Sequence, residues 1–173
     1  MSRIDLVTPQ WLFERLGDPS IVILDGSYYL PAAKRDADAE YREAHIPGAI
    51  RFDIDAVKDK ASPLPHMLPE ADEFAAAVGA MGISDEHQVV VYDGAGIFAS
   101  PRVAWTFRTF GARSVAVLDG GFPAWSEAGY PIETGVPPVP EAAEFLAKFD
   151  EAAVADLDDV RQALAEGTAQ VLD

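Results

Sequence analysis

The chain alternates short apolar runs with stretches in which apolar residues recur at helical spacing. Three of the runs are apolar almost throughout, as expected of strands buried on both faces of a parallel sheet: Ile21–Leu24, Val89–Tyr92 and Ser114–Leu118. A shorter run at Ala49–Phe52 predicts a fourth strand. Because helical segments separate these runs, the pattern predicts an α/β domain with a central parallel sheet and helices on both faces.

Capping and turn residues set the expected helix boundaries. Thr8 followed by Pro9 predicts an N-cap and a proline at the first helical position, which opens a helix running to Leu16. Further helices are expected at Ala37–Ala44, Glu70–Met81, Ser100–Phe110 and Phe122–Ala128. Gly82 directly follows the helix that ends at Met81 and is its expected C-cap.

The C-terminal part of the chain differs in composition. Residues 131–140 include four prolines, which is typical of a stiff, extended linker. The segment after it is similar to the start of the chain, with an amphipathic helix and an apolar run that ends in Leu172-Asp173 as the first strand ends in Leu24-Asp25. This weak repeat divides the chain into a first domain, a linker and the start of a truncated second domain, at residues 1–135, 136–155 and 156–173. A lone strand of that kind would have no sheet partners, so we expect its segment to be disordered or borrowed; an ordinary C-terminal helix with a tail is the alternative.

Charge and hydropathy exclude several classes of function. Thirteen basic against 29 acidic residues give a net charge of −16, and there is no basic stripe. Nucleic acid and anionic membrane surfaces are therefore not expected partners. The longest apolar runs have the length of strands, so no membrane span is expected. The segment Met1–Trp11 lacks the basic start and apolar stretch of a signal peptide, which makes a cytoplasmic protein the default expectation.

Metal and redox chemistry also find little support. The chain contains no cysteine, so it has neither a disulfide framework nor a cysteine–metal site. Its three histidines and its acidic residues do not show metal-ligand spacing. We expect no cofactor.

Asp93 is the strongest candidate for a functional residue from its position in the chain. It ends the Val89–Tyr92 run, and a small-residue loop, Gly94-Ala95-Gly96, separates it from the helix expected at Ser100. A strand, a tight loop and a helix N-terminus form the place where α/β proteins bind anions or hold a nucleophile. A carboxylate there could cap the loop and helix amides, or it could act as a nucleophile in phosphoryl transfer. Metal-assisted phosphoryl transfer needs further carboxylates nearby, and none follows Asp93 in the loop, so capping is favoured.

Two longer motifs resemble the signatures of rhodanese-type sulfurtransferases. The segment Glu40–Ala49 (EYREAHIPGA) resembles the first signature and Leu118–Trp125 (LDGGFPAW) resembles the second. Four segments between them are similar to the N-terminal domain of the two-domain members, which include thiosulfate and 3-mercaptopyruvate sulfurtransferases: residues 52–55, 62–69, 91–93 and 100–102. The resemblance is dense over residues 5–135 and faint in the tail.

The resemblance implies a rhodanese-like three-layer α/β/α fold and a division of labour between two domains. In these enzymes a cysteine of the C-terminal domain takes up sulfane sulfur as a persulfide, from 3-mercaptopyruvate or thiosulfate, and passes it to a thiol or cyanide. The N-terminal copy lacks that cysteine, and Asp93 stands in its place here. The expected partners are the C-terminal rhodanese domain of the same protein and a small-molecule sulfur donor. The chain alone is expected to be inactive, because sulfur transfer needs a soft thiolate and a carboxylate is a hard anion.

The resemblance also assigns supporting residues. Asp55 and His66 match an aspartate and a histidine that are proposed to form a relay with a serine of the C-terminal catalytic loop. A different interpretation has His66 making an inter-domain hydrogen bond and Asp55 capping a short helix. Leu30, Pro31 and Phe98 match positions that line the substrate pocket, although the 3-mercaptopyruvate branch commonly has tyrosine at the position of Phe98.

Two residues outside this set carry structural expectations. His45 is expected to tie the turn of the first signature together, and Arg102 is expected to be a buried ion-pair partner rather than an anion binder.

A function of another class stays open: a complete, cysteine-free rhodanese-like module that binds a partner. Residues 156–173 separate the two interpretations. A truncated tandem protein predicts a flexible tail without a sheet and an exposed apolar docking patch, whereas a finished module predicts an ordered tail packed on the domain.

Overall fold

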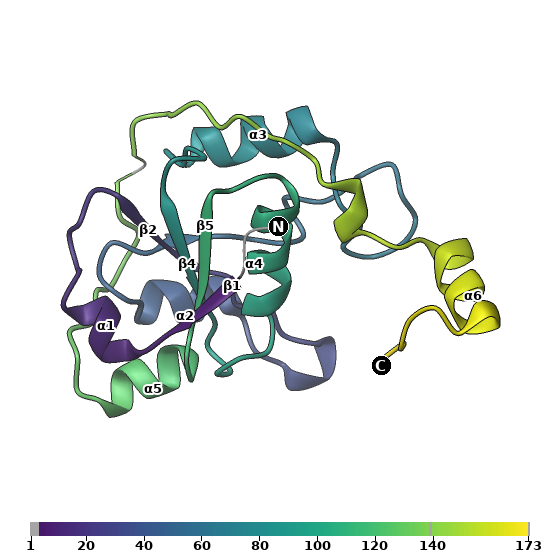
Figure 1. Ribbon diagram of the computed structural model, residues 1–173. Coiled ribbons are helices and arrows are strands. Elements are labelled where there is room, and N and C mark those ends of the chain that lie inside the picture. The colour runs from purple at the N-terminus through teal and green to yellow at the C-terminus, as the bar shows by residue number, and fades with distance from the viewer. Residues whose placement is uncertain (1–3, 139, 173) are drawn as a thin grey trace.

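A five-stranded parallel sheet forms the centre of the computed structural model, which describes residues 4–138 and 140–172 (Figure 1). Its strands are β1 (Ile4–Val7), β2 (Ile21–Asp25), β3 (Ile50–Arg51), β4 (Gln88–Tyr92) and β5 (Ser114–Leu118). They lie in the order β1-β5-β4-β2-β3, and every pair is parallel. The α/β class predicted from the sequence is confirmed.

Helices cover both faces of this sheet, which makes three layers. The helices are α1 (Pro9–Phe13), α2 (Ala37–Glu43), α3 (Ala71–Ala80), α4 (Ser100–Thr109), α5 (Gly121–Glu127) and α6 (Leu157–Glu166), with short 3-10 turns η1 (Pro31–Ala33) and η2 (Glu151–Ala153). In Figure 1, α3 and α4 lie on one side of the strands, and α1, α2 and α5 gather on the other. Helix α6 stands apart from the sheet, near the C-terminus.

Alternation along the central strands divides the core into two parts. Val89 and Val91 face a cluster that includes the aromatic rings of Phe74 in α3, Phe107 in α4 and Phe110, the C-cap of α4. Their neighbours Val90 and Tyr92 face the opposite cluster, which holds Leu12 of α1 and Trp125 of α5. Successive side chains of a strand point to opposite faces, so a strand buried on both sides must be apolar at every position. This explains why these strands could be recognised from the sequence.

Strand β1 was not predicted. It pairs with β5 at one edge of the sheet, and its two middle residues are exposed. An edge strand keeps one side open to solvent, so its residues do not form the fully apolar run that marked the central strands. Helix α1 also differs from the prediction: it begins at Pro9 as expected but ends at Phe13, before Leu16.

The segment expected to be a linker packs onto the domain. The amide of Ala143 donates to the carbonyl of Gly79 (2.9 Å), and the amide of Lys148 donates to the carbonyl of Phe110 (2.9 Å). Between them, Phe145 is 4% exposed and lies in the cluster between α3 and α4. The extended chain is therefore a strap over the α3–α4 face as well as a connection.

The tail forms a helix with little tertiary packing. Asp156 caps the first turn of α6 in a capping box with Asp159, and Gly167 ends the helix in the left-handed conformation. None of the residues of α6 is buried. Val171 and Leu172 form no strand, and Asp173, which the repeat aligns with Asp25, lies outside the described residues. Among the described residues, no helix is long and apolar enough to cross a membrane.

Candidate functional site

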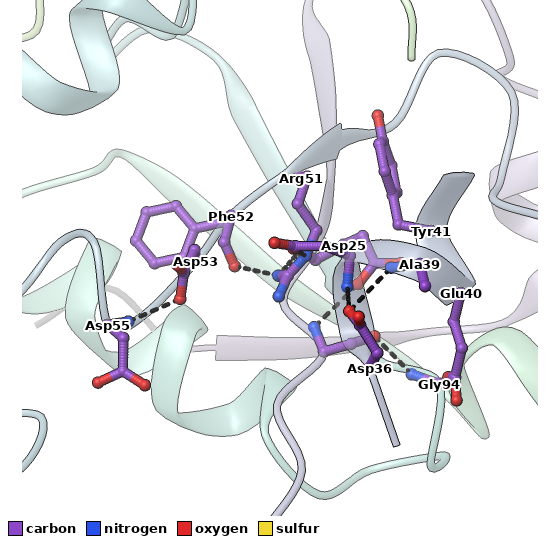
Figure 2. Close-up of polar contacts among 12 residues, drawn as sticks. Asp25, Asp36, Ala39, Glu40, Tyr41, Arg51, Phe52, Asp53, Asp55 and Gly94 are labelled. Atoms are coloured by element: carbon purple, nitrogen blue, oxygen red, sulfur yellow. Dashed lines mark hydrogen bonds and ion pairs between the residues drawn. The ribbon is translucent and has the colours of Figure 1, made fainter. Parts of the chain in front are cut away.

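Two loops come together at the carboxyl edge of the sheet, where β2 and β4 end side by side. Asp25 is the last residue of β2 and lies in register with Tyr92, the last of β4. The chain after β4 forms the Asp93 loop, residues 93–99. The chain after β3, residues 53–69, forms a second loop, and Arg51 ties its start to β2 by donating to the carbonyl oxygens of Asp25 (3.1 Å) and Phe52 (2.6 Å) (Figure 2). The carboxyl edge is where open α/β sheets bind ligands.

The Asp93 carboxylate fills its own loop. One oxygen accepts from the amide of Ala95 (2.9 Å). The other accepts from the amides of Phe98 (2.8 Å) and Ala99 (2.9 Å). The same oxygen also accepts from the amide (2.8 Å) and hydroxyl (2.7 Å) of Ser100, the first residue of α4. The side chain is therefore a cap of the loop and the helix N-terminus.

Two opposing effects set the ionisation of Asp93. Its burial raises the pKa of the carboxyl, but the donors of Ser100, Phe98 and Ala95 outweigh burial and hold the pKa below its ordinary value. The donors that could hold an external anion are thus already occupied by a permanent internal one.

The mouth of the Asp93 loop is also covered. The amide of Gly94 donates to the Ser27 hydroxyl (2.9 Å), and Arg35 donates to the Gly94 carbonyl (3.2 Å). A side chain at Gly94 would collide with the hydroxyl of Tyr29, so the tyrosine could lie in its present position only beside a glycine. Below the loop, Gly121 has a φ of 57°, and a side chain there would collide with the Asp93 carbonyl.

A cavity of about 240 Å³ lies beside this cover. Its walls include a bidentate ion pair, Arg35 to Glu40 at 2.8 and 2.7 Å, and Tyr29 donates to the same carboxylate at 2.7 Å. Burial raises the pKa of Asp25 at the base of the cavity, against the lowering effect of its hydrogen bonds with Ser27. The polar groups named here satisfy one another, which indicates a structural role for this cavity.

Asp55 and His66 meet in the second loop. The carboxylate of Asp53 accepts from the amide of Asp55 (2.8 Å) and fixes the turn in which it lies (Figure 2). Asp55 Oδ1 then lies 3.5 Å from His66 Nδ1 and 2.7 Å from Lys58 Nζ. The structure thus brings together the two residues predicted to support a relay.

His66 is held in an unusual backbone conformation. Its φ of 54° lies in the left-handed region, which a residue with a side chain rarely adopts. Arg102 of α4 donates from its guanidinium to the carbonyl of His66. Tyr28 packs edge-on against the imidazole, with ring centroids 4.8 Å apart. Strain that the surroundings maintain is typical of functional sites.

A more open, apolar cavity lies against this group. It has a volume of about 390 Å³, and its walls include Tyr28, Pro65, His66, Met67, Phe98 and Arg102. Phe98 is 55% exposed, so much of this wall faces outward.

Only some of the predicted site residues lie together at this cavity. Phe98 lines the same cavity as His66, whereas Leu30 and Pro31 are not among the lining residues. Tyr28 and Arg102 were not predicted at this site. The ion pair expected for Arg102 is wrong, since no acidic side chain lies within 4.0 Å of its guanidinium in the described part of the chain. Within that same part, no group of three histidine or acidic side chains could hold a metal ion.

His45 behaves as expected for a turn residue. It is fully buried, its Nδ1 lies 2.7 Å from the carbonyl of Tyr41, and its backbone pairs with Glu133 in both directions.

Comparisons with known proteins agree with this architecture. A family model described as "Rhodanese-like domain" matches residues 8–128. The chain is 44% identical over 174 residues to 3-mercaptopyruvate sulfurtransferase of Rattus norvegicus, covering 97% of the chain and 58% of the relative. It is 41% identical over 174 residues to 3-mercaptopyruvate sulfurtransferase of Escherichia coli, covering 100% of the chain and 62% of the relative.

Solved structures show the same likeness. The crystal structure of a 3-mercaptopyruvate sulfotransferase from Escherichia coli superposes with a TM-score of 0.90 at 40% identity, covering 97% of this chain and 64% of that one. The Tum1 protein of Saccharomyces cerevisiae superposes with a TM-score of 0.83 at 31% identity, covering 96% and 58%. The chain therefore spans about three fifths of the length of these relatives.

Proposed function

Because this chain belongs to the rhodanese-like domain family, we propose that it is the cysteine-free domain of a two-domain sulfurtransferase. The catalytic cysteine would lie in a second rhodanese-like domain, which is the expected partner. The sulfur donor would be 3-mercaptopyruvate or thiosulfate, and the acceptor a thiol or cyanide. Fold alone does not assign activity; the proposal draws on relatives that are named as 3-mercaptopyruvate sulfurtransferases.

The observation that carries the proposal is the closed Asp93 loop. The donors that would stabilise a thiolate are occupied by the Asp93 carboxylate, and the chain has no cysteine. This copy of the fold keeps the cradle and lacks the nucleophile. A domain of this kind supports chemistry only across an interface.

The proposed reaction begins on the partner domain. Its thiolate would attack the sulfur of 3-mercaptopyruvate, and the carbon–sulfur bond would break. The carbon would leave as the enolate of pyruvate and take the proton of the former thiol, which leaves a persulfide on the cysteine. With thiosulfate, the same attack would break the sulfur–sulfur bond and release sulfite.

Asp55 and His66 would contribute from this chain. The carboxylate lies 3.5 Å from the imidazole and could orient it. An imidazole suits proton movement near neutral pH. Phe98 would supply an apolar wall beside His66, because both line one cavity.

The tail supports the same proposal over the alternative. A self-contained binding module predicts an ordered tail packed on the domain; the tail does form a capped helix, but α6 buries no residue. Leu157 and Leu164 of α6 are each 64% exposed, which suits a helix that packs on a partner.

The test compares three proteins in a cyanide-dependent thiocyanate assay with 3-mercaptopyruvate. They are the 173-residue chain, the complete polypeptide encoded by its gene, and that polypeptide with the second-domain cysteine changed to serine. We expect turnover only from the complete polypeptide with its cysteine. Robust turnover by the chain alone would refute the proposal.

A further inference from the structure

The carboxylate of Asp55 faces two basic side chains, and only one of them lies at hydrogen-bonding distance. Its Oδ1 atom accepts from the ammonium of Lys58 at 2.7 Å. The same atom lies 3.5 Å from Nδ1 of His66. Hydrogen bonds from nitrogen to oxygen in proteins span about 2.7–3.2 Å. Lys58 therefore holds the carboxylate that the imidazole would need.

Nδ1 of His66 has no other acceptor in its surroundings. The atom is buried and without a hydrogen-bond partner. Tyr28 contacts the imidazole edge-on, and Arg102 donates to the backbone carbonyl of His66 and not to the ring. In the part of the chain that the structure describes, no second acidic side chain lies within 4.0 Å of the imidazole. Asp55 is therefore the available acceptor for a proton on Nδ1.

The two contacts of the Asp55 carboxylate are close in strength. Lys58 brings a full charge, but the two side chains of that pair are 30% and 45% exposed. Water and salt screen such a pair, and ordering a lysine side chain costs entropy, so the pair contributes little stability. The His66 side chain is 25% exposed, so a bond to it would be better shielded, although an uncharged imidazole is the weaker donor. Removal of one contact should therefore favour the other.

We propose that Lys58 is a positioning residue that competes with His66 for the Asp55 carboxylate and thereby controls whether the relay pair forms. While the ammonium binds Asp55, nothing orients the imidazole through Nδ1. Without the ammonium, Asp55 accepts from the Nδ1–H group and the pair closes. The part of this pair in catalysis rests on the proposed function. The competition is measured on the isolated chain without turnover, so its failure and the failure of the proposed function can be distinguished.

The experiment reads which nitrogen of each imidazole carries the proton, from nitrogen-15 NMR of the histidine-labelled chain. A pH of about 8.5 suits it, because imidazoles are normally uncharged there and lysines are still charged. The other two histidines serve as references in the same spectrum. Nδ1 of His45 faces the Tyr41 carbonyl at 2.7 Å and must carry a proton. Nδ1 of His87 accepts from the amide of Ser84 at 2.9 Å and must lack one. We expect His66 in the unmodified chain to resemble His87.

Substitutions of the lysine assign the effect. Lys58→Met should raise the ratio of the Nδ1–H to the Nε2–H form of His66 at least about tenfold, because a hydrogen bond to a charged group typically contributes that much. Lys58→Arg keeps the charge and should leave the ratio unchanged. Lys60→Met is the matched control, because Lys60 is exposed and has no acidic side chain within 4.0 Å among the described residues. Adding Asp55→Ala to Lys58→Met should cancel the change, since the acceptor is then gone.

Three results would each overturn the proposal. They are an Nδ1–H form of His66 in the unmodified chain, an unchanged ratio in folded Lys58→Met, and an equal change in Lys60→Met. If Lys58→Met does not fold, Lys58→Gln takes its place, because it also removes the charge and keeps a polar side chain. The same tenfold rise is expected of it, and an unchanged ratio would again refute the competition.

Discussion

The two loops at the carboxyl edge of the sheet differ in how well the hydrogen-bonding groups buried at each are satisfied. In the Asp93 loop, a buried carboxylate accepts from four amides and one hydroxyl. At the second loop, Nδ1 of His66 is buried without a hydrogen-bond partner, and so is Nε of Arg102, an α4 residue that donates to the His66 carbonyl through its Nη atom. Buried polar groups are normally satisfied, so each exception needs an explanation.

The Asp93 loop therefore has a structural role, whereas the unsatisfied groups at the second loop remain available to a ligand or partner. A filled anion cradle stabilises the fold and can bind nothing more. A guanidinium and an imidazole with unused hydrogen-bonding capacity are costly to bury in the isolated domain, so we expect a ligand or partner to complete them. The sequence pattern points to Asp93 as the candidate reactive residue, but the polar groups available for chemistry lie at the second loop.

The largest loss of stability should come from removing the carboxylate that fills the Asp93 loop. Asp93→Ala would leave four amides and a hydroxyl without their acceptor. We expect the free energy of unfolding to fall by about 3 kcal/mol or more, measured by urea denaturation. Asp93→Asn keeps one acceptor oxygen and should lose less. A loss below about 1 kcal/mol in Asp93→Ala would show that the loop does not depend on its carboxylate.

Steric closure of the same loop should give the next largest effect. Gly121→Ala places a side chain against the carbonyls of Asp93 and Gly96 in a left-handed conformation. We expect a loss of about 2–3 kcal/mol in the free energy of unfolding. Gly129→Ala is the matched control, with a φ of 72° and open space around it, and it should cost about 1 kcal/mol. Equal losses in the two variants would mean that the approach of Gly121 to Asp93 is unimportant.

A substitution in the second loop should have the opposite effect on stability. His66→Gly removes a side chain at a φ of 54° and keeps the carbonyl that Arg102 binds. We expect stability to be unchanged or raised by up to about 1 kcal/mol in thermal unfolding, since glycine adopts this conformation freely. If the proposed function is right, the same change in the complete polypeptide should lower its sulfurtransferase kcat about 10- to 100-fold. A stable variant with full activity would remove His66 from the proposed function.

The smallest effect concerns acid stability. The pKa of Asp93 is lower in the folded chain than its ordinary value of about 3.9, so its stabilisation is complete above that value. It is lost as the pH falls through the folded pKa. The difference in unfolding free energy between the unmodified chain and Asp93→Asn should be constant from about pH 7 to pH 5 and shrink below about pH 4. A difference that grows on acidification would contradict the assigned direction.

Local signals made most of the fold predictable. An apolar run, a loop of small residues and Pro101 at the start of a helix are enough to place β4, the Asp93 loop and α4. The order of the strands could not be predicted in the same way, because it depends on which strands pair and not on the pattern within each. Strand β1 was missed for a different reason: it lies at the edge beside β5, and its two exposed middle residues interrupt the apolar run that marks a buried strand.

The site was less predictable than the fold. Asp55 and His66 came from resemblance to a family and not from any local rule. Arg102 meets His66 across a long stretch of sequence, through a backbone carbonyl that no pattern of side chains reveals. Tyr28 contacts the imidazole in the same non-local way. Contacts of this kind are set by tertiary structure, which explains why the expected ion pair of Arg102 was wrong.

The strap formed by residues 141–150 sets a practical limit on modularity. Phe145 contributes an aromatic ring to the α3–α4 core and packs edge-on against Phe74, with ring centroids 5.5 Å apart. A domain exchange between relatives with the chain cut after residue 135 would therefore remove Phe145 and leave a cavity in the core of the transferred domain. We therefore expect a unit that can be exchanged intact to extend at least through Asp150, whose amide donates to the carbonyl of Thr109 (2.8 Å).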